Sequence, residues 1–229
     1  MKFLSLQGNR LKRIDPKLFG NLKRLSVLRL DNNRKLNKID SQGLYGLHSL
    51  NSLRLERCHL SFIESDIFIH CTHTIEFLYL HNNYLTNLSE STFAHMTSLL
   101  ELNLEYNCLE KLERDVFKDL CELKSLSIKS NKLSFIEHGL FKNLRGLQFL
   151  DLSKNLIENL DPSIFKSLTS LKNLRLDSNL LRVIDVFKHV ETLSSLSACQ
   201  ELYLESNEIE NLEPYAFKSL LSLKKLSLR

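Results

Sequence analysis

Residues 99–122 read LLELNLEYNCLEKLERDVFKDLCE, and this stretch of 24 residues decides the fold. Leu102 and Leu104 alternate with other residues, and a period of two predicts a short β-strand with one buried face. Asn107 follows where the chain must turn, and Phe117 and Leu120 lie on the return half of the unit. A single unit cannot bury its own apolar side, so this stretch requires neighbours that repeat it.

The same unit recurs along the whole chain. The pattern L-x-x-L-x-L-x-x-N-x-L-x-x-L-x-x-x-x-F-x-x-L-x-x fits units starting at residues 1, 25, 50, 75, 99, 123, 147, 171 and 199, with a partial unit from 223. The ninth position holds Cys58 in one unit and asparagine in the other eight, namely Asn9, Asn33, Asn83, Asn107, Asn131, Asn155, Asn179 and Asn207. Phenylalanine fills the nineteenth position in seven units: Phe19, Phe68, Phe93, Phe117, Phe141, Phe165 and Phe217. We expect these asparagines to form a ladder whose amides satisfy backbone groups of adjacent coils.

Stacked units of this kind form a solenoid with a parallel β-sheet along one side. Strands lie ~4.8 Å apart, and a wider return side makes such a stack curve. We therefore predict an α/β horseshoe, with the sheet on the concave face and an irregular or short-helical convex face. The repeat predicts one domain over residues 1–229, with about nine full repeats and a partial one, uncapped at both ends.

The N-x-L-x-x-L-x-x-x-x-F-x-x-L half of the unit resembles the typical 24-residue class of extracellular leucine-rich repeat proteins. Toll-like receptor ectodomains, Slit-type guidance proteins and small leucine-rich proteoglycans share it, and the chain is most similar to a fragment of a Toll-like receptor ectodomain. The cysteine-rich caps of that class are absent, and the chain starts and stops inside a strand unit. The resemblance implies a ligand-recognition module of an innate-immune cell-surface receptor, with signal peptide, membrane anchor and signalling domain lying outside this chain.

Two other roles remain open for the same repeat class. A secreted or matrix-associated adhesion or guidance protein would carry the same units. An intracellular protein-interaction scaffold would explain unpaired thiols. Enzymatic activity is not expected, because the repeat forces no catalytic set of side chains together and six scattered glycines form no phosphate loop.

The composition of the chain argues against several classes of partner and ligand. The chain has 31 basic and 27 acidic residues and a net charge of +4, so it lacks the basic excess of a nucleic-acid or membrane-surface protein. Apolar runs are too short for a membrane span. His59, His70 and His73 beside Cys58 and Cys71 match no common zinc pattern. We expect no metal and no cofactor.

The five cysteines are predicted to be mostly free thiols. Cys58, Cys71 and Cys199 occupy inward positions of their units, whereas Cys108 and Cys121 point outward. No two lie in adjacent coils at matching positions, and strands two coils apart are about 10 Å apart, beyond disulfide reach.

Two local features stand outside the regular pattern. The unit 171–198 is four residues longer than the norm, and helical spacing there predicts a short helix on the return side, through Val186, Val190, Leu193 and Leu196. Asn87-Leu88-Ser89 is an N-glycosylation sequon at an outward position between two leucines.

The predicted ligand site lies on the strands. Positions three, five, seven and eight of each unit are expected to point outward and to stack into one surface. Aromatic and charged side chains concentrate there in the second to fifth coils: Arg29, Arg54, Glu56, Arg57, Phe77, Tyr79, His81, Glu105 and Tyr106. Tyr and Arg are enriched at binding hot spots, and mixed charge suits a protein or pathogen-derived ligand on the concave or lateral face. The extra segment of unit 171–198, residues 185–191, is a second candidate as a contact or dimerisation element. An ordinary solvated sheet stabilised by cross-strand pairs is the alternative.

Overall fold

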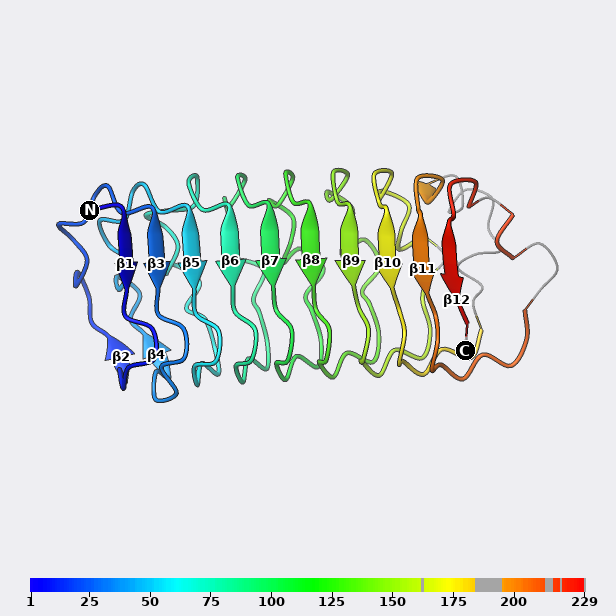
Figure 1. The fold of residues 1–229 in the computed structure, drawn as a ribbon, viewed down its shortest axis with the longest axis horizontal. Coiled ribbons are helices and arrows are strands. Elements are labelled where there is room, and N and C mark those ends of the chain that lie inside the picture. The colour runs from blue at the N-terminus through cyan, green and yellow to red at the C-terminus, as the bar shows by residue number, and fades with distance from the viewer. Residues whose placement is uncertain (162, 184–194, 213–215, 219, 229) are drawn as a thin grey trace.

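The chain folds into a single row of stacked coils with one long parallel sheet (Figure 1). The computed structural model describes residues 1–229 except 162, 184–194, 213–215, 219 and 229. Ten three-residue strands form the sheet in chain order: β1 (Phe3–Ser5), β3 (Val27–Arg29), β5 (Ser52–Arg54), β6 (Phe77–Tyr79), β7 (Glu101–Asn103), β8 (Ser125–Ser127), β9 (Phe149–Asp151), β10 (Asn173–Arg175), β11 (Glu201–Tyr203) and β12 (Lys225–Ser227). Two shorter strands, β2 (Arg13–Ile14) and β4 (Lys38–Ile39), follow β1 and β3 in the first two coils and pair with each other. The predicted solenoid is confirmed.

The strand register places identical repeat positions side by side. Leu78 pairs with Leu102, and Leu102 pairs with Leu126. Every pair in the sheet is parallel, so each position of the repeat forms a column that runs along the solenoid. Residues far apart in the sequence thus become neighbours on one surface.

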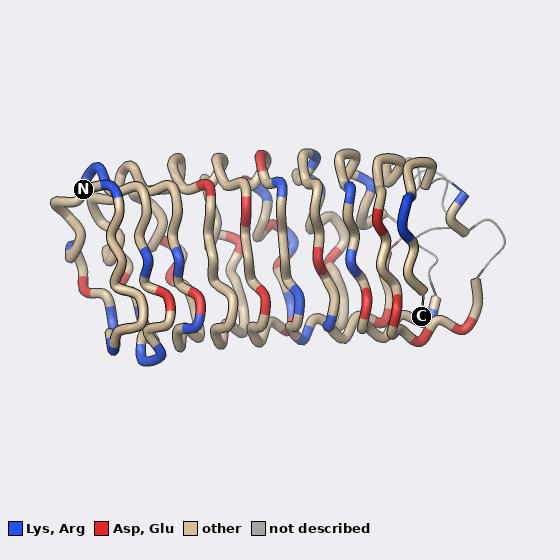
Figure 2. Tube along the Cα trace, viewed as in Figure 1, with Lys and Arg blue, Asp and Glu red and all other residues tan. Residues whose placement is uncertain are grey.

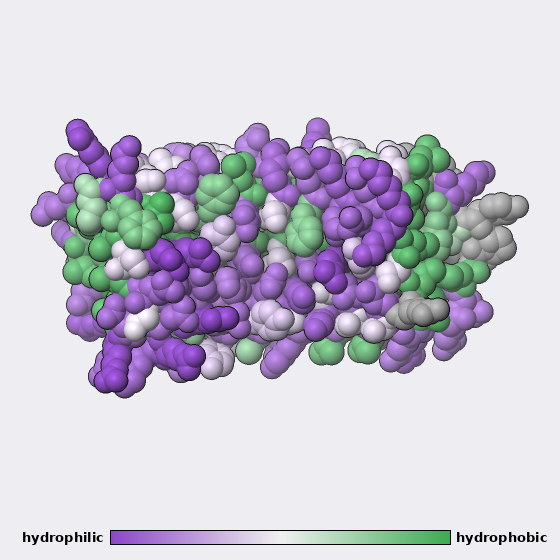
Figure 3. Space-filling view, in the orientation of Figure 1, coloured by the Kyte–Doolittle hydropathy of each residue, from purple (hydrophilic) through white to green (hydrophobic). Residues whose placement is uncertain are grey.

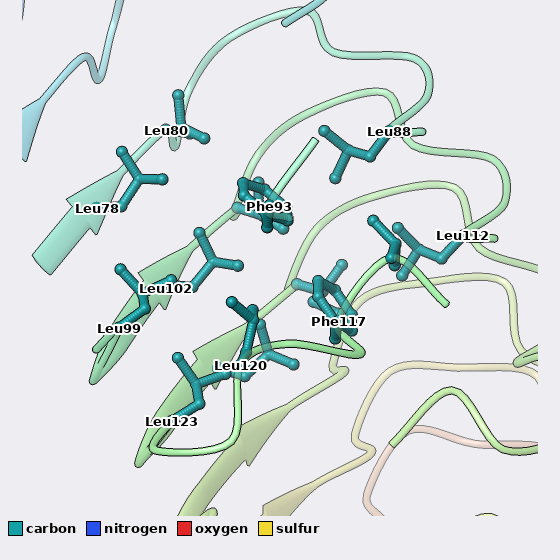
Figure 4. Close-up of a cluster of buried hydrophobic side chains, with 14 of the residues drawn as sticks. Leu78, Leu80, Leu88, Phe93, Leu99, Leu102, Leu112, Phe117, Leu120 and Leu123 are labelled. Atoms are coloured by element: carbon teal, nitrogen blue, oxygen red, sulfur yellow. The ribbon is translucent and has the colours of Figure 1, made fainter. Parts of the chain in front are cut away.

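The core is a stack of leucines closed by phenylalanines on the return side (Figure 4). Phe93 and Phe117 are almost completely buried. The rings of Phe68 and Phe93 stack with centroids 6.4 Å apart, and those of Phe93 and Phe117 are 6.2 Å apart. These separations exceed the ~4.8 Å between neighbouring strands, so the stack curves with the sheet on its concave side. We call the exposed side of the sheet the concave face.

A left-handed residue ends the strand segment of every full coil. The eighth position has φ between 52° and 71° in all nine coils: Gly8, Asn32, Arg57, Asn82, Tyr106, Ser130, Lys154, Ser178 and Ser206. This conformation costs a non-glycine residue about 1–2 kcal/mol. From Gly8 to Ser178, the amide of this residue donates to a carbonyl of the next coil, as Tyr106 N does to Lys129 O at 2.9 Å. The sequence did not predict this feature, because glycine occupies the position only once.

The ninth position turns inward and bridges two coils. Asn107 Nδ2 donates to Leu104 O of its own coil at 3.1 Å and to Leu80 O of the preceding coil at 3.0 Å. Its Oδ1 accepts the amide of Leu85 at 3.1 Å. The same contacts recur at Asn33, Asn83, Asn131, Asn155, Asn179 and Asn207. Asn9, in the first coil, is exposed and bonds only to Leu6 O and Gln7 O of its own coil.

Cys58 breaks this ladder, and the preceding coil compensates. Its thiol lies 3.5 Å from Leu30 O, but it has no oxygen to accept an amide from that coil. The preceding unit carries one extra residue near Arg34, and there the amide of Leu36 donates to Asn33 O at 2.8 Å. The missing acceptor therefore leaves no unpaired amide at Leu36. The helix predicted from Val186 to Leu196 falls mainly on residues 184–194, which lie outside the described residues.

Candidate functional site

The columns of the concave face are less exposed than expected. Phe77, Arg54 and Tyr79 at positions three and five are half-buried. At position seven, the side chains of Asp31 and Glu56 are buried. Buried polar side chains also occur in later coils at positions five and seven: Ser127, Asp151, Ser153 and Asp177. The prediction that positions five and seven are exposed is therefore wrong for the buried side chains in these two columns.

One ion pair forms along the strand segment in each of two adjacent coils. Arg29 Nε and Nη2 donate to the two carboxylate oxygens of Asp31 at 3.1 Å and 3.2 Å. Arg54 Nε donates to Glu56 Oε1 at 2.9 Å. Figure 2 shows these pairs as blue followed by red on the segments of β3 and β5. The bidentate contact of Arg29 fixes its guanidinium in place, and the carboxylate of each pair offsets the charge of its arginine.

Arg54 also contacts the next coil. Its guanidinium lies over the ring of Tyr79, 4.8 Å from the centroid, which is within cation–π range. The rings of Tyr79 and His81 meet edge to face at 6.5 Å. Burial and neighbouring Glu101 raise the pKa of Tyr79, so it remains a neutral hydroxyl at physiological pH. We call Arg29, Asp31, Arg54, Glu56, Tyr79 and His81 the N-terminal cluster.

Two buried polar atoms of the N-terminal cluster have no hydrogen-bond partner among the residues that the structure describes. These are Glu56 Oε2 and His81 Nδ1. Burial is the main cause that lowers the pKa of His81, while Glu56 and Glu105 oppose the shift. A buried polar atom without a partner costs free energy, so both atoms have unused capacity for a ligand group or for water.

The other predicted site residues lie around this cluster. Phe77 is half-buried on β6, and Glu105 accepts a hydrogen bond from Ser127 at 2.8 Å. Arg57 and Tyr106 occupy left-handed eighth positions and are exposed, so they lie on the rim of the sheet. The structure thus places five of the nine residues in the N-terminal cluster and Phe77 and Glu105 on the neighbouring strand segments. The other two, Arg57 and Tyr106, lie on the rim.

A second cluster has the same construction, and the sequence singled out only two of its members, Glu201 and Lys225, as smaller candidates. The guanidinium of Arg175 lies 4.7 Å from the ring centroid of Tyr203 in the next coil, and its Nε donates to Asp177 Oδ1 at 3.2 Å. Lys225 lies over the same ring at 4.7 Å. Tyr203 donates to Glu201 Oε2 at 2.8 Å. The signal was available, because R-x-D/E in one unit is followed by tyrosine at position five of the next unit in both places. We call Arg175, Asp177, Glu201, Tyr203 and Lys225 the C-terminal cluster.

The sheet side is mainly hydrophilic between its two ends. Figure 3 shows hydrophobic atoms gathered near β1 and β12, with polar atoms dominating between them. At those ends Phe3, Leu226 and Leu228 are exposed. The middle of the face therefore suits a ligand held by polar and aromatic contacts rather than by an extended apolar patch.

The cysteines are unpaired and unreactive where buried. Cys58, Cys71 and Cys199 are buried free thiols, while Cys121 is exposed. Burial raises the pKa of Cys58 to about 11, that of Cys71 to about 12 and that of Cys199 to about 11. The buried thiols are therefore protonated at neutral pH and are poor nucleophiles.

Three further features bear on predicted sites. Asn87 is exposed between the buried Leu85 and Leu88, so its side chain is open to modification. In the described part of the chain, no group of His, Cys, Asp and Glu is placed to hold a metal ion. No helix among the same residues has the length and apolar character needed to cross a bilayer.

Comparisons with known proteins identify the repeat. The family model for the leucine rich repeat matches residues 1–60, 73–126, 121–181 and 150–198, more than half of the chain. The structure of the TLR13–ssRNA13 complex matches with a TM-score of 0.77 and 28% identity, over 97% of this chain and 35% of that chain. The glycosylated Toll–Spatzle complex from Drosophila matches with a TM-score of 0.82 and 21% identity, over 100% of this chain and 35% of that chain. A second Toll–Spatzle structure matches with a TM-score of 0.75 and 23% identity, over 93% of this chain and 31% of that chain. The chain spans about a third of the length of these solved proteins.

Proposed function

The chain belongs to the leucine-rich repeat family, and from this premise we propose that it is part of a Toll-like receptor ectodomain that recognises a protein ligand on its concave face. The N-terminal cluster is the proposed contact site. The likeness to TLR13 and Toll supports the receptor context, since it extends over nearly the whole of this chain. The proposed location is the cell surface or extracellular space.

One observation carries the proposal. Within the N-terminal cluster, Tyr79 is held between Arg54 and His81. Two buried atoms of the same cluster, Glu56 Oε2 and His81 Nδ1, have no partner in the described part of the chain. A prearranged aromatic–arginine pair loses little conformational entropy on binding, which favours affinity. A ligand group that pairs with the two atoms would remove their cost.

The charge of the cluster favours a protein over a polyanion. Asp31 and Glu56 neutralise Arg29 and Arg54, so the cluster presents no excess of positive charge. A polyanionic ligand gains affinity from unpaired Lys and Arg side chains, whereas both arginines of the cluster are already paired with acids. Paired charges beside an aromatic ring are instead typical of protein interfaces.

The test measures which cluster contacts a ligand. Residues 1–229, displayed as a bivalent fusion, are screened against a library of secreted and cell-surface proteins, and the dissociation constant of each binder is measured by biolayer interferometry. Tyr79→Ala and Arg54→Ala should each weaken the complex about 5- to 30-fold, equal to about 1–2 kcal/mol.

Tyr203→Ala is the matched control, since it removes the same arginine–tyrosine stack from the C-terminal cluster. Its affinity should equal that of the wild type. Unchanged affinity for both N-terminal variants would exclude that cluster, and a loss confined to Tyr203→Ala would move the site to the C-terminal cluster.

The extracellular location is tested at Asn87. The exposed sequon predicts a glycan when the chain is expressed through a secretory pathway. Mass spectrometry before and after glycosidase treatment should show a mass shift that Asn87→Gln abolishes. An unmodified Asn87 in the secreted protein would count against this part of the proposal.

A further inference from the structure

A hollow lies on the edge of the solenoid, outside the concave clusters, where three adjacent strand segments end. Its volume is about 320 Å³, and it is lined by Arg34, Arg57, Cys58, His59, Asn82 and Tyr84. These residues follow β3, β5 and β6, and strands in a parallel sheet end at the same edge. The volume is at the lower end of the ~300–1,000 Å³ typical of ligand pockets.

The hollow coincides with the irregular coils. Arg34 belongs to the unit with one extra residue, and Cys58 stands where the other full units have asparagine. Arg57 and Asn82 are both held in the left-handed conformation, with φ of 54° and 57°. The pocket is thus built on backbone fixed by hydrogen bonds, since the amide of Arg57 donates to His81 O at 3.1 Å.

The cations of the hollow differ from those of the strands. In the described part of the chain, the guanidinium groups of Arg34 and Arg57 form no ion pair, whereas Arg29 and Arg54 are paired with acids. The six lining residues include no carboxylate. Figure 2 shows this edge in blue below the strand segments of β3 and β5. Two uncompensated guanidinium groups at one hollow attract an anion.

The remaining lining groups add hydrogen-bond donors and an aromatic wall. The side-chain amide of Asn82 and the imidazole of His59 can donate to oxygen atoms. The ring of Tyr84 is half-exposed and meets the ring of His59 edge to face at 5.1 Å. Forked guanidinium donors match the oxygens of phosphate and sulfate groups, and an aromatic ring packs against the organic part of an ester.

We propose that this edge hollow binds a small phosphate or sulfate ester, with Arg34 and Arg57 holding the tetrahedral anion and Tyr84 contacting the organic group. This site is independent of the protein ligand proposed for the N-terminal cluster. Tyr79→Ala, which removes that cluster's central ring, should leave anion binding unchanged.

The experiment is isothermal titration of residues 1–229 with inorganic phosphate, inorganic sulfate, phenyl phosphate and acetate, at constant ionic strength set by chloride. Phosphate or sulfate should bind saturably at one site per chain, and the tighter of the two identifies the anion. Phenyl phosphate should bind more tightly than inorganic phosphate. Arg57→Gln and Arg34→Gln should each weaken binding about tenfold or more.

Lys154→Gln is the matched control. Lys154 is also an exposed cation at a left-handed eighth position, and its removal changes the net charge equally. Its affinity should equal that of the wild type, with folding of all variants checked by circular dichroism. The proposal is overturned by the absence of saturable binding, by an equal loss in Lys154→Gln, or by acetate binding as tightly as phosphate and sulfate.

Discussion

The three central coils, residues 99–170, and the two coils of residues 25–74 stack on the same sheet but close their turns differently. In the central coils each asparagine bridges its own coil and the preceding one, as Asn131 does through Leu104 O, Ile128 O and the amide of Leu109. In the irregular coils Cys58 replaces the bridge, and an internal contact of Leu36 with Asn33 takes over. The buried backbone groups at these turns therefore need hydrogen-bond partners, but the partner need not be an asparagine side chain.

Both regions share the phenylalanine stack, and substitutions in it should reduce the stability of the fold most. Phe117→Ala should lower the free energy of unfolding by about 3–5 kcal/mol, because it leaves a cavity among fully buried side chains. Phe68→Ala in the irregular coils should cost about the same. Urea denaturation followed by circular dichroism measures both.

Phe135→Ala is the control for this effect, since its ring is 47% exposed and its removal should cost far less. A small loss for Phe68→Ala beside a large loss for Phe117→Ala would mean that the irregular coils are packed less well than the structure indicates.

Loss of a bridging asparagine should reduce stability more than loss of an asparagine that bonds within its own coil. Asn131→Leu should destabilise the chain by about 3 kcal/mol, because the buried amide of Leu109 and two carbonyls lose their partner. Asn9→Leu should cost much less, since Asn9 is exposed and bonds only within its own coil. The measurement is again the urea midpoint. Equal losses at the two positions would contradict the bridging role.

A smaller change in stability is expected when asparagine is restored at the ninth position of the irregular coil. Cys58→Asn restores the ladder residue, but the amide of Leu36 already has an acceptor, so the free energy of unfolding should change by less than about 1 kcal/mol. Cys58→Leu, which supplies no polar group, should be less stable than Cys58→Asn. A gain of several kcal/mol in Cys58→Asn would show that the extra residue does not compensate for the missing bridge.

The smallest effect concerns pH. Burial lowers the pKa of His81, so the unfolded chain binds this proton more readily than the folded chain does. Stability is therefore full above the ordinary histidine pKa and decreases as pH falls through it. Between about pH 7.5 and about pH 5.5 the wild type should lose more in Tm than His81→Gln does. His73→Gln, at an exposed position, should follow the wild type; a wild-type-like loss in His81→Gln would contradict this assignment.

The period of the leucines was enough to predict the sheet, its register and the burial of residues such as Leu102 and Phe117, because one buried face per strand admits one register. The ion pairs could not be predicted in the same way. Whether Arg54 lies over the ring of Tyr79 depends on the rotamer of Arg54. The burial of Glu56 depends on the long side chains around it. The C-terminal cluster was within reach of the sequence, since Arg175 and Tyr203 repeat the spacing of Arg54 and Tyr79 with the longer unit between them. The edge hollow was not, because it depends on how the coil at Arg34 accommodates its extra residue.

The eighth position of the coil has a consequence for how such a scaffold can change. Its backbone is held left-handed by a hydrogen bond to the next coil, while the side chain is glycine, asparagine, arginine, tyrosine, serine or lysine. Side-chain identity there is decoupled from the framework, so each coil offers one site where new chemistry can be introduced at little structural risk. A library randomised at Arg57, Tyr106 and Lys154 would therefore sample altered binding preferences on an unchanged solenoid backbone.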